Sequence, residues 1–201
     1  MTAISLTVFL DFVTSSGSPK LTKVIEVKKR PDYHPSTDFW KILRDAIAEF
    51  HNMGLVNKQY FDQIISGVTE KNRKALYPEV VKKYKSFLGN KQITSTPAPK
   101  VIWTHGGLDV RVNPELLLTI NGDVHLIKLY FKKETLSKNR VAIIQLLMQL
   151  ALGSTLNQPV KYCVLDIQRN KLYSTSTPDV KLRPLLEGEA TAFAAIYNAL
   201  T

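Results

Sequence analysis

Cysteine is almost absent from this chain of 201 residues, which contains only Cys163. A single cysteine excludes an internal disulfide framework and any zinc site built from several cysteines, and it is typical of the reducing cytoplasm. The sequence also lacks an apolar run long enough to cross a bilayer, and it lacks the pattern of a signal peptide. A nucleophile elbow, a phosphate-binding loop and a dinucleotide fingerprint are missing too. We therefore expect a cytoplasmic protein with no membrane contact and no resident cofactor.

Acidic residues are scarce relative to basic ones. The chain has 27 Lys and Arg against 17 Asp and Glu, which gives a formal net charge of +10. A positive charge of this size favours a polyanionic partner, DNA or RNA, although it also serves solubility or binding to an acidic protein. The hydrophobic content of 44% is enough for a substantial core.

The first 92 residues predict a β-hairpin followed by helices. Residues 7–14 and 21–27 are rich in apolar and β-branched residues, and a turn rich in Ser, Gly and Pro separates them, which is typical of a hairpin. Helical spacing of apolar residues then predicts three helices, at about 36–51, 57–66 and 69–88. We expect the last helix to belong to the core, and the Pro- and Ser-containing residues 89–100 to form a linker.

The remaining residues, 100–201, predict a mixed β-sheet flanked by helices. Strands are expected at 100–104, 108–120, 123–132, 161–167 and 171–174, with helices at 137–152 and 185–200. The pair Asn121-Gly122 is the strongest signal for a two-residue hairpin turn, and it pairs Ile120 with Asp123. Counting back from this turn places Glu115 beside Lys128. We expect this α/β core and the N-terminal part to form one compact unit.

The order helix, three-strand meander, helix, strand, strand, helix over about residues 69–200 resembles the core of the PD-(D/E)XK phosphodiesterase superfamily, the restriction-endonuclease-like fold. That family carries an acid at the start or middle of its second core strand and an acid-x-Lys triplet on the third. Pro114-Glu115 matches the first element and Lys128 matches the final lysine, whereas Leu126 occupies the position of the second acid. The resemblance implies catalytic positions at Glu115 and Lys128, a metal ligand in Glu115, and a glutamine near the site in Gln145.

The missing acid determines which function the resemblance implies. Mg²⁺ prefers several oxygen ligands in octahedral geometry, so Glu115 beside a leucine is a poor chelator. The chain is therefore expected to be a nucleic-acid-binding protein derived from a nuclease and catalytically impaired or inactive. Two alternatives stay open: an active Mg²⁺-dependent nuclease whose second ligand comes from another element, and a non-catalytic adaptor that binds an acidic protein partner. The sequence also leaves open whether the chain forms a homodimer.

Other charged residues bear on these alternatives. Four basic residues follow the strand of Lys128 and form the predicted nucleic-acid-binding surface: Lys132, Lys133, Lys138 and Arg140. An ordinary cross-strand ion pair is an equally good interpretation of Glu115 and Lys128. A second match to the family motif, formed by Asp11, Glu26 and Lys28 on the predicted N-terminal hairpin, is an alternative site, although no helix precedes it.

Overall fold

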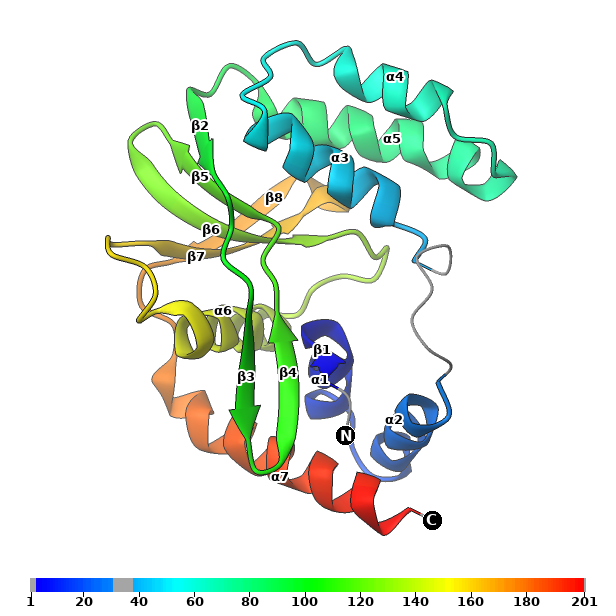
Figure 1. Cartoon of the computed structure of the whole chain (residues 1–201), viewed down its shortest axis with the longest axis vertical. Helices are drawn as coiled ribbons and strands as arrows, with labels where there is room; N and C mark the ends of the chain where they lie inside the picture. Colours follow the sequence, from blue (N-terminus) through cyan, green and yellow to red (C-terminus); the bar gives the residue numbers. More distant parts are fainter. Residues whose placement is uncertain (1–2, 31–37, 201) are drawn as a thin grey trace.

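The computed structural model describes residues 3–30 and 38–200, and within them seven α-helices flank two mixed β-sheets (Figure 1). The larger sheet has three antiparallel strands, then a parallel strand and an antiparallel edge strand, in the order β2 (Ile93–Thr96), β5 (Leu116–Ile120), β6 (Asp123–Tyr130), β7 (Lys161–Asp166) and β8 (Lys171–Thr175). The smaller sheet has the order β1 (Ile4–Ser5), β4 (Leu108–Val112) and β3 (Val101–His105). The predicted α/β class is confirmed.

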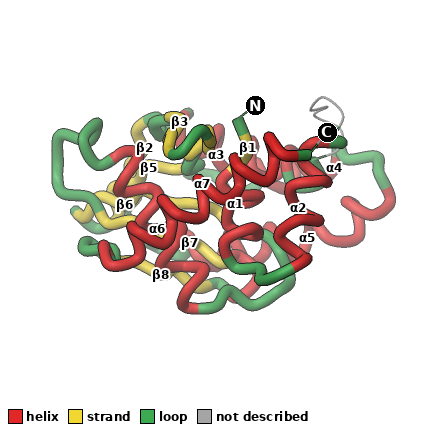
Figure 2. Tube along the Cα trace, turned by 90° about the horizontal axis from the view of Figure 1, so that it is seen from below, coloured by secondary structure: helices red, strands yellow, loops and turns green. Residues whose placement is uncertain are grey.

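The helices cover opposite faces of the larger sheet. One face packs against α3 (Lys41–Asn52), α4 (Tyr60–Ser66) and α5 (Lys71–Leu88). The other packs against α6 (Lys138–Leu152), which shares a second group of core residues with α1 (Leu6–Val13), α2 (Ser18–Lys28) and α7 (Arg183–Ala199). In this second group α1 and α7 contact β4 of the smaller sheet, and α1 and α2 lie side by side (Figure 2). Because side chains alternate along a strand, Leu126 and Tyr130 of β6 enter the second group, whereas Ile127 and Leu129 enter the first.

The predicted N-terminal β-hairpin is wrong, because its two strands are the helices α1 and α2. The side chain of Ser5 caps α1 by accepting the N–H of Val8 at 3.3 Å, and Pro19 stands in the first turn of α2. Nearly every residue of α1 is apolar, so the spacing of its apolar residues fits a strand as well as a helix. Burial of Phe9 and Phe12 in the core outweighs the β propensity of the sequence.

The local signals in the second half of the chain predict its structure well. Ile120 faces Asp123 across the turn, and Asn121 and Gly122 have φ values of 51° and 93°, the left-handed conformation that the predicted turn requires. Ser137 caps α6 by accepting the N–H of Arg140 at 3.2 Å. The predicted start of the first of these three helices, residues 36–37, lies outside the described residues.

Two further corrections concern residues 89–120. The predicted linker contains β2, an edge strand that pairs with β5, and the predicted strand 108–120 is divided into β4 and β5, which belong to different sheets. Pro114 lies at this division, because it cannot donate to a strand ladder.

Strands β2 to β5 form a single hairpin that bends across both sheets. Ile93 faces Ile120 in the β2–β5 ladder. Eight residues forward from Ile93 and eight residues back from Ile120, past the prolines, lie Val101 and Val112, which face each other in the β3–β4 ladder. The residues between the ladders, 97–100 and 113–116, therefore lie opposite each other without an inserted residue on either side. We refer to residues 93–120 as the bent ribbon.

Candidate functional site

A groove of about 1060 Å³ opens where the bent ribbon changes its neighbouring strand. In the smaller sheet β4 lies next to β1, with Arg111 facing Ser5, whereas in the larger sheet β5 lies next to β6, with Leu116 facing Ile127. The groove lies between the ends of β1 and β6, and α3 contributes the opposite wall. Crevices where neighbouring strands diverge are common binding sites in α/β proteins.

Basic side chains outnumber acidic ones in this groove. The seven basic side chains that line it are Arg30, Lys41, Arg44, Lys100, Arg111, Lys128 and Lys132, and the three acidic ones are Asp38, Asp45 and Glu115. The lining therefore carries a net positive charge, which attracts anions.

The basic side chains on the α3 wall of the groove form ion pairs with neighbouring acidic side chains. Arg44 donates to Asp38 at 2.7 Å, and Lys41 pairs with Asp45. Burial alone would lower the pKa of Arg44, but the hydrogen bond to Asp38 and the charges of Asp38, Glu115 and Asp45 raise it above its usual value. Arg44 thus connects the α3 wall electrostatically to Glu115 on the other side of the groove.

Glu115 and Lys128 form the predicted ion pair. The ammonium of Lys128 donates to one carboxylate oxygen of Glu115 and, at 2.9 Å, to the carbonyl of Asn113. The second oxygen of Glu115 accepts the backbone N–H of Leu129 at 2.7 Å. The side chain of Glu115 is only 9% exposed and that of Lys128 only 17%, so this charge-assisted network is partly shielded from water. The contact predicted from the hairpin register is confirmed.

The pair also has a structural role, which follows from the local sequence. The β5–β6 ladder ends at Leu116, after Pro114, yet the N–H of Glu115 still donates to the carbonyl of Ile127 at 3.0 Å. Beyond that point the Glu115 carboxylate, instead of a backbone carbonyl, accepts the N–H of Leu129. Glu115 therefore holds the end of β6 against the bend of the ribbon.

The residues around Glu115 do not fit a magnesium ion. Leu126, in the position of the second acid, is completely buried and packs in the core on the same face as Lys128. Both carboxylate oxygens of Glu115 already accept hydrogen bonds from Lys128 and Leu129. Among the described residues, no group of three or more His, Cys, Asp or Glu side chains could hold a metal ion. A carboxylate bound by an ammonium and next to hydrocarbon does not offer the open oxygen ligands that Mg²⁺ requires.

Gln145 does not lie beside this pair. Its side-chain amide is buried and donates to the carbonyls of Tyr162, at 3.1 Å, and Tyr173, at 3.3 Å. Gln145 is not part of the groove lining, and its contacts join α6 to β7 and β8.

The four basic residues that were predicted to bind nucleic acid do not form one surface in the groove. Lys132 lines the groove and pairs with Asp11 at 3.3 Å. Arg140 bonds to the same carboxylate and, at 2.9 Å, to the hydroxyl of Thr14. Lys133 and Lys138 are exposed outside the groove lining.

The alternative site at Asp11, Glu26 and Lys28 is wrong, because the two strands that it requires are helices. Each residue has its own contacts. Asp11 binds Arg140 and Lys132, and Glu26 binds Lys23 at 2.8 Å on the same helix. Lys28 donates to backbone carbonyls at the end of the chain.

Two groove residues, Lys100 and Arg111, were missed by the sequence analysis. Both are exposed, and neither forms an ion pair with another described residue. Lys100 fell in the predicted linker. The alternation of buried Val110 and Val112 with Arg111 was a signal that this arginine points away from the core.

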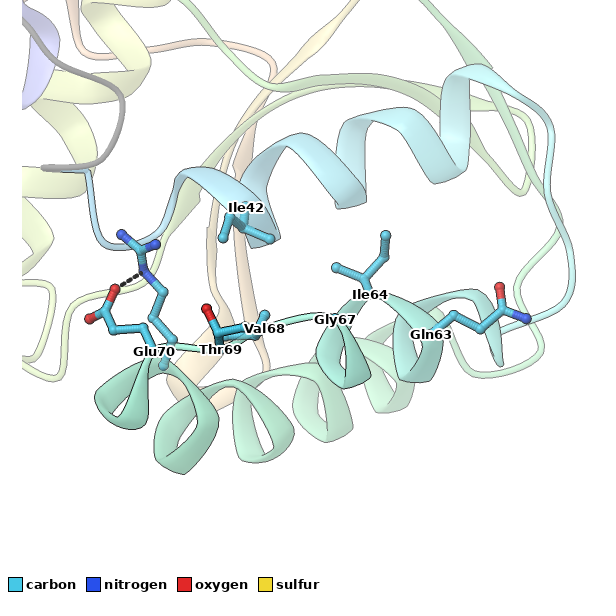
Figure 3. Close-up of a pocket in the computed structure, with 8 residues that line it drawn as sticks. Ile42, Gln63, Ile64, Gly67, Val68, Thr69 and Glu70 are labelled. Atoms are coloured by element: carbon cyan, nitrogen blue, oxygen red, sulfur yellow. Dashed lines mark ion pairs between the residues drawn. The ribbon is translucent and has the colours of Figure 1, made fainter.

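A second, smaller pocket of about 340 Å³ lies between α3, α4 and α5 (Figure 3). Figure 3 shows Ile42 from α3 and Ile64 from α4 at this pocket, and at one end Arg73 pairs with Glu70 at 3.1 Å. Its lining is mainly apolar and contains a single, internally paired set of charges. The larger groove is therefore the candidate functional site.

Comparisons with known proteins add no relative: no protein-family model and no curated protein matches the chain. Within the described part of the chain, no helix has both the length and the apolar character of a membrane span.

Proposed function

We propose that the protein binds nucleic acid in the groove and derives from a PD-(D/E)XK nuclease that has lost its metal site. The observation that carries this proposal is the Glu115–Lys128 ion pair, which lies in a groove lined by seven basic and three acidic side chains. An isolated ion pair would be an ordinary structural feature, but its position in a concave surface with an excess of basic side chains gives it functional weight.

The strand order supports the proposed ancestry. Helix α5 is followed by the antiparallel strands β2, β5 and β6, then by α6 and the parallel strand β7. Glu115 directly precedes the second of these strands, and Lys128 lies on the third. These are the positions that the resemblance implies, with the β3–β4 hairpin inserted between the first and second strands.

The chemistry of the groove favours binding over cleavage. Hydrolysis of a phosphodiester by this family requires a metal-activated water, and the buried Leu126 and the engaged Glu115 leave no ligand set for the metal. The positive groove can still neutralise phosphates, which is the main source of nucleic-acid affinity.

Binding and cleavage assays test this proposal. Labelled DNA and RNA should bind at 50 mM salt, bind much more weakly at 200 mM salt, and remain uncleaved with Mg²⁺ or Mn²⁺. No binding at low salt would favour the adaptor that recognises an acidic protein. Metal-dependent cleavage that Glu115→Ala or Lys128→Ala abolishes would instead establish an active nuclease.

A further inference from the structure

We infer that the groove accepts a single nucleic-acid strand, which it holds by its phosphates, and excludes a duplex. This inference rests on the proposed function and specifies its ligand. Three features of the groove support it: its size, the distribution of its charges, and the contacts that its aromatic rings already make within the protein.

The size of the groove suits one strand. A duplex about 20 Å across that rises about 3.4 Å per base pair fills about 1,000 Å³ for each pair, so the whole groove would hold about one base pair. The same volume, 1060 Å³, holds a short run of nucleotides from one strand. The groove therefore cannot enclose a duplex over more than about one base pair.

The basic residues lie on two facing sides. Lys100 and Arg111 stand on the bent ribbon, and Lys41 and Arg44 stand on α3, where they pair with Asp45 and Asp38. A single strand between these sides would meet cations from both, as in grooves that follow the backbone of single-stranded nucleic acids. Because Lys100 and Arg111 form no ion pair with other described residues, they can bind phosphate without first breaking an ion pair within that part of the chain.

The aromatic rings of the groove are already engaged. Trp40 stacks on Tyr77, with an interplanar angle of 22°, and on Phe131, with an angle of 14°. The hydroxyl of Tyr130 donates to the carbonyl of Glu134 at 3.1 Å, and this side chain is buried. Base stacking is the usual source of extra affinity in single-strand binding proteins. Here the phosphates must provide the affinity, and we expect little preference among bases.

The test compares single strands with duplexes of equal length on the full chain. Fluorescence anisotropy would measure binding at several salt concentrations. The ligands are three single strands of 12 nucleotides, made of dT, dA or U (dT12, dA12 and U12), and a 12-base-pair DNA duplex. Simple electrostatics favours the duplex, since its charge density is higher, so a preference for single strands cannot come from net charge alone. We expect each single strand to bind at least about tenfold more tightly than the duplex, with affinities that agree within about threefold.

Two charge-reversal variants with the same net charge locate the binding surface. Lys100→Glu/Arg111→Glu should weaken single-strand binding at least about tenfold. The slope of the logarithm of the binding constant against the logarithm of the salt concentration should become shallower by about 1.4, because two phosphate contacts are lost. Lys74→Glu/Lys181→Glu changes two exposed residues outside the groove and should have a much smaller effect. Thermal unfolding of both variants would confirm that they are folded.

The outcomes separate the two proposals. Tighter binding of the duplex, or equal losses in the two variants, would overturn the single-strand inference while nucleic-acid binding stood. Absence of binding to all four ligands at low salt would overturn both.

Discussion

Lys128 and Glu115 are bonded across the point at which the β5–β6 ladder ends, and the carboxylate also accepts the N–H of Leu129. The same two residues thus close the end of a sheet and line a basic groove. These two roles can be separated, because stability reports the first and nucleic-acid affinity reports the second.

Removal of the carboxylate should destabilise the fold. In Glu115→Ala, Lys128 loses its charged partner and the N–H of Leu129 loses its acceptor, so we expect the free energy of unfolding to fall by about 2–4 kcal/mol. Urea denaturation would measure it. Glu79→Ala is the matched control, since it removes an exposed ion pair with Lys83 and should have little effect. Equal results for the two variants would show that Glu115 has no structural role.

Restoring the second acid should fail in this chain. Leu126 is completely buried among apolar side chains, so Leu126→Glu should lower the free energy of unfolding by about 3–5 kcal/mol or prevent folding. Leu126→Met keeps the site apolar and should cost less than about 1.5 kcal/mol. Urea denaturation and Mn²⁺ titration would test both variants. A stable Leu126→Glu protein that binds Mn²⁺ would show that the metal site is recoverable with one substitution.

Acid should weaken the packing of α3 against α5. The imidazole of His51 is buried 2.5 Å from the hydroxyl of Tyr84, and burial lowers its pKa from 6.5 to about 4. The folded state therefore favours the neutral ring. Its contribution is complete above pH 6.5 and is lost as the pH falls toward 4, by up to about 3 kcal/mol. Urea denaturation at pH 7 and pH 4.5 would measure this loss, and His51→Gln should show a smaller one. An unchanged pH dependence in this variant would contradict the assignment.

The two neighbouring lysines after β6 should differ in their effect on binding. Lys132 lines the groove, whereas Lys133 is exposed outside it, so Lys132→Gln should weaken binding of dT12 more than Lys133→Gln. Anisotropy at 50 mM salt would compare them. Equal losses would show that the binding surface extends beyond the groove, as the sequence alone suggested.

The sequence predicts structure where a local signal is sufficient. Asn121-Gly122 determines its own turn, and the register that follows was enough to bring Glu115 to Lys128. Ser137 likewise marks the start of α6. Residues 6–13 are almost uniformly apolar, so helical and strand periods cannot be distinguished there, and only the tertiary packing of Phe9 and Phe12 favours the helix.

The rest of the site depends on contacts between distant segments. Strand β2 is short, polar and at the edge of the sheet, so its identity depends on pairing with β5 rather than on its own sequence. The groove exists because α3 lies opposite the bent ribbon, and nothing within residues 41–52 indicates this neighbour. The ion pair was therefore predictable, whereas the basic surface around it was not.

The bent ribbon restricts how the length of this region can change. Its two ladders share one register, so a residue inserted in 97–100 alone would turn the side chains of β3 to the opposite face of the smaller sheet. An insertion on one side must be compensated by an insertion on the other, in 113–116. Changes in loop length here should consequently occur in pairs, and matched insertions offer protein engineers a way to widen the groove while both sheets keep their cores.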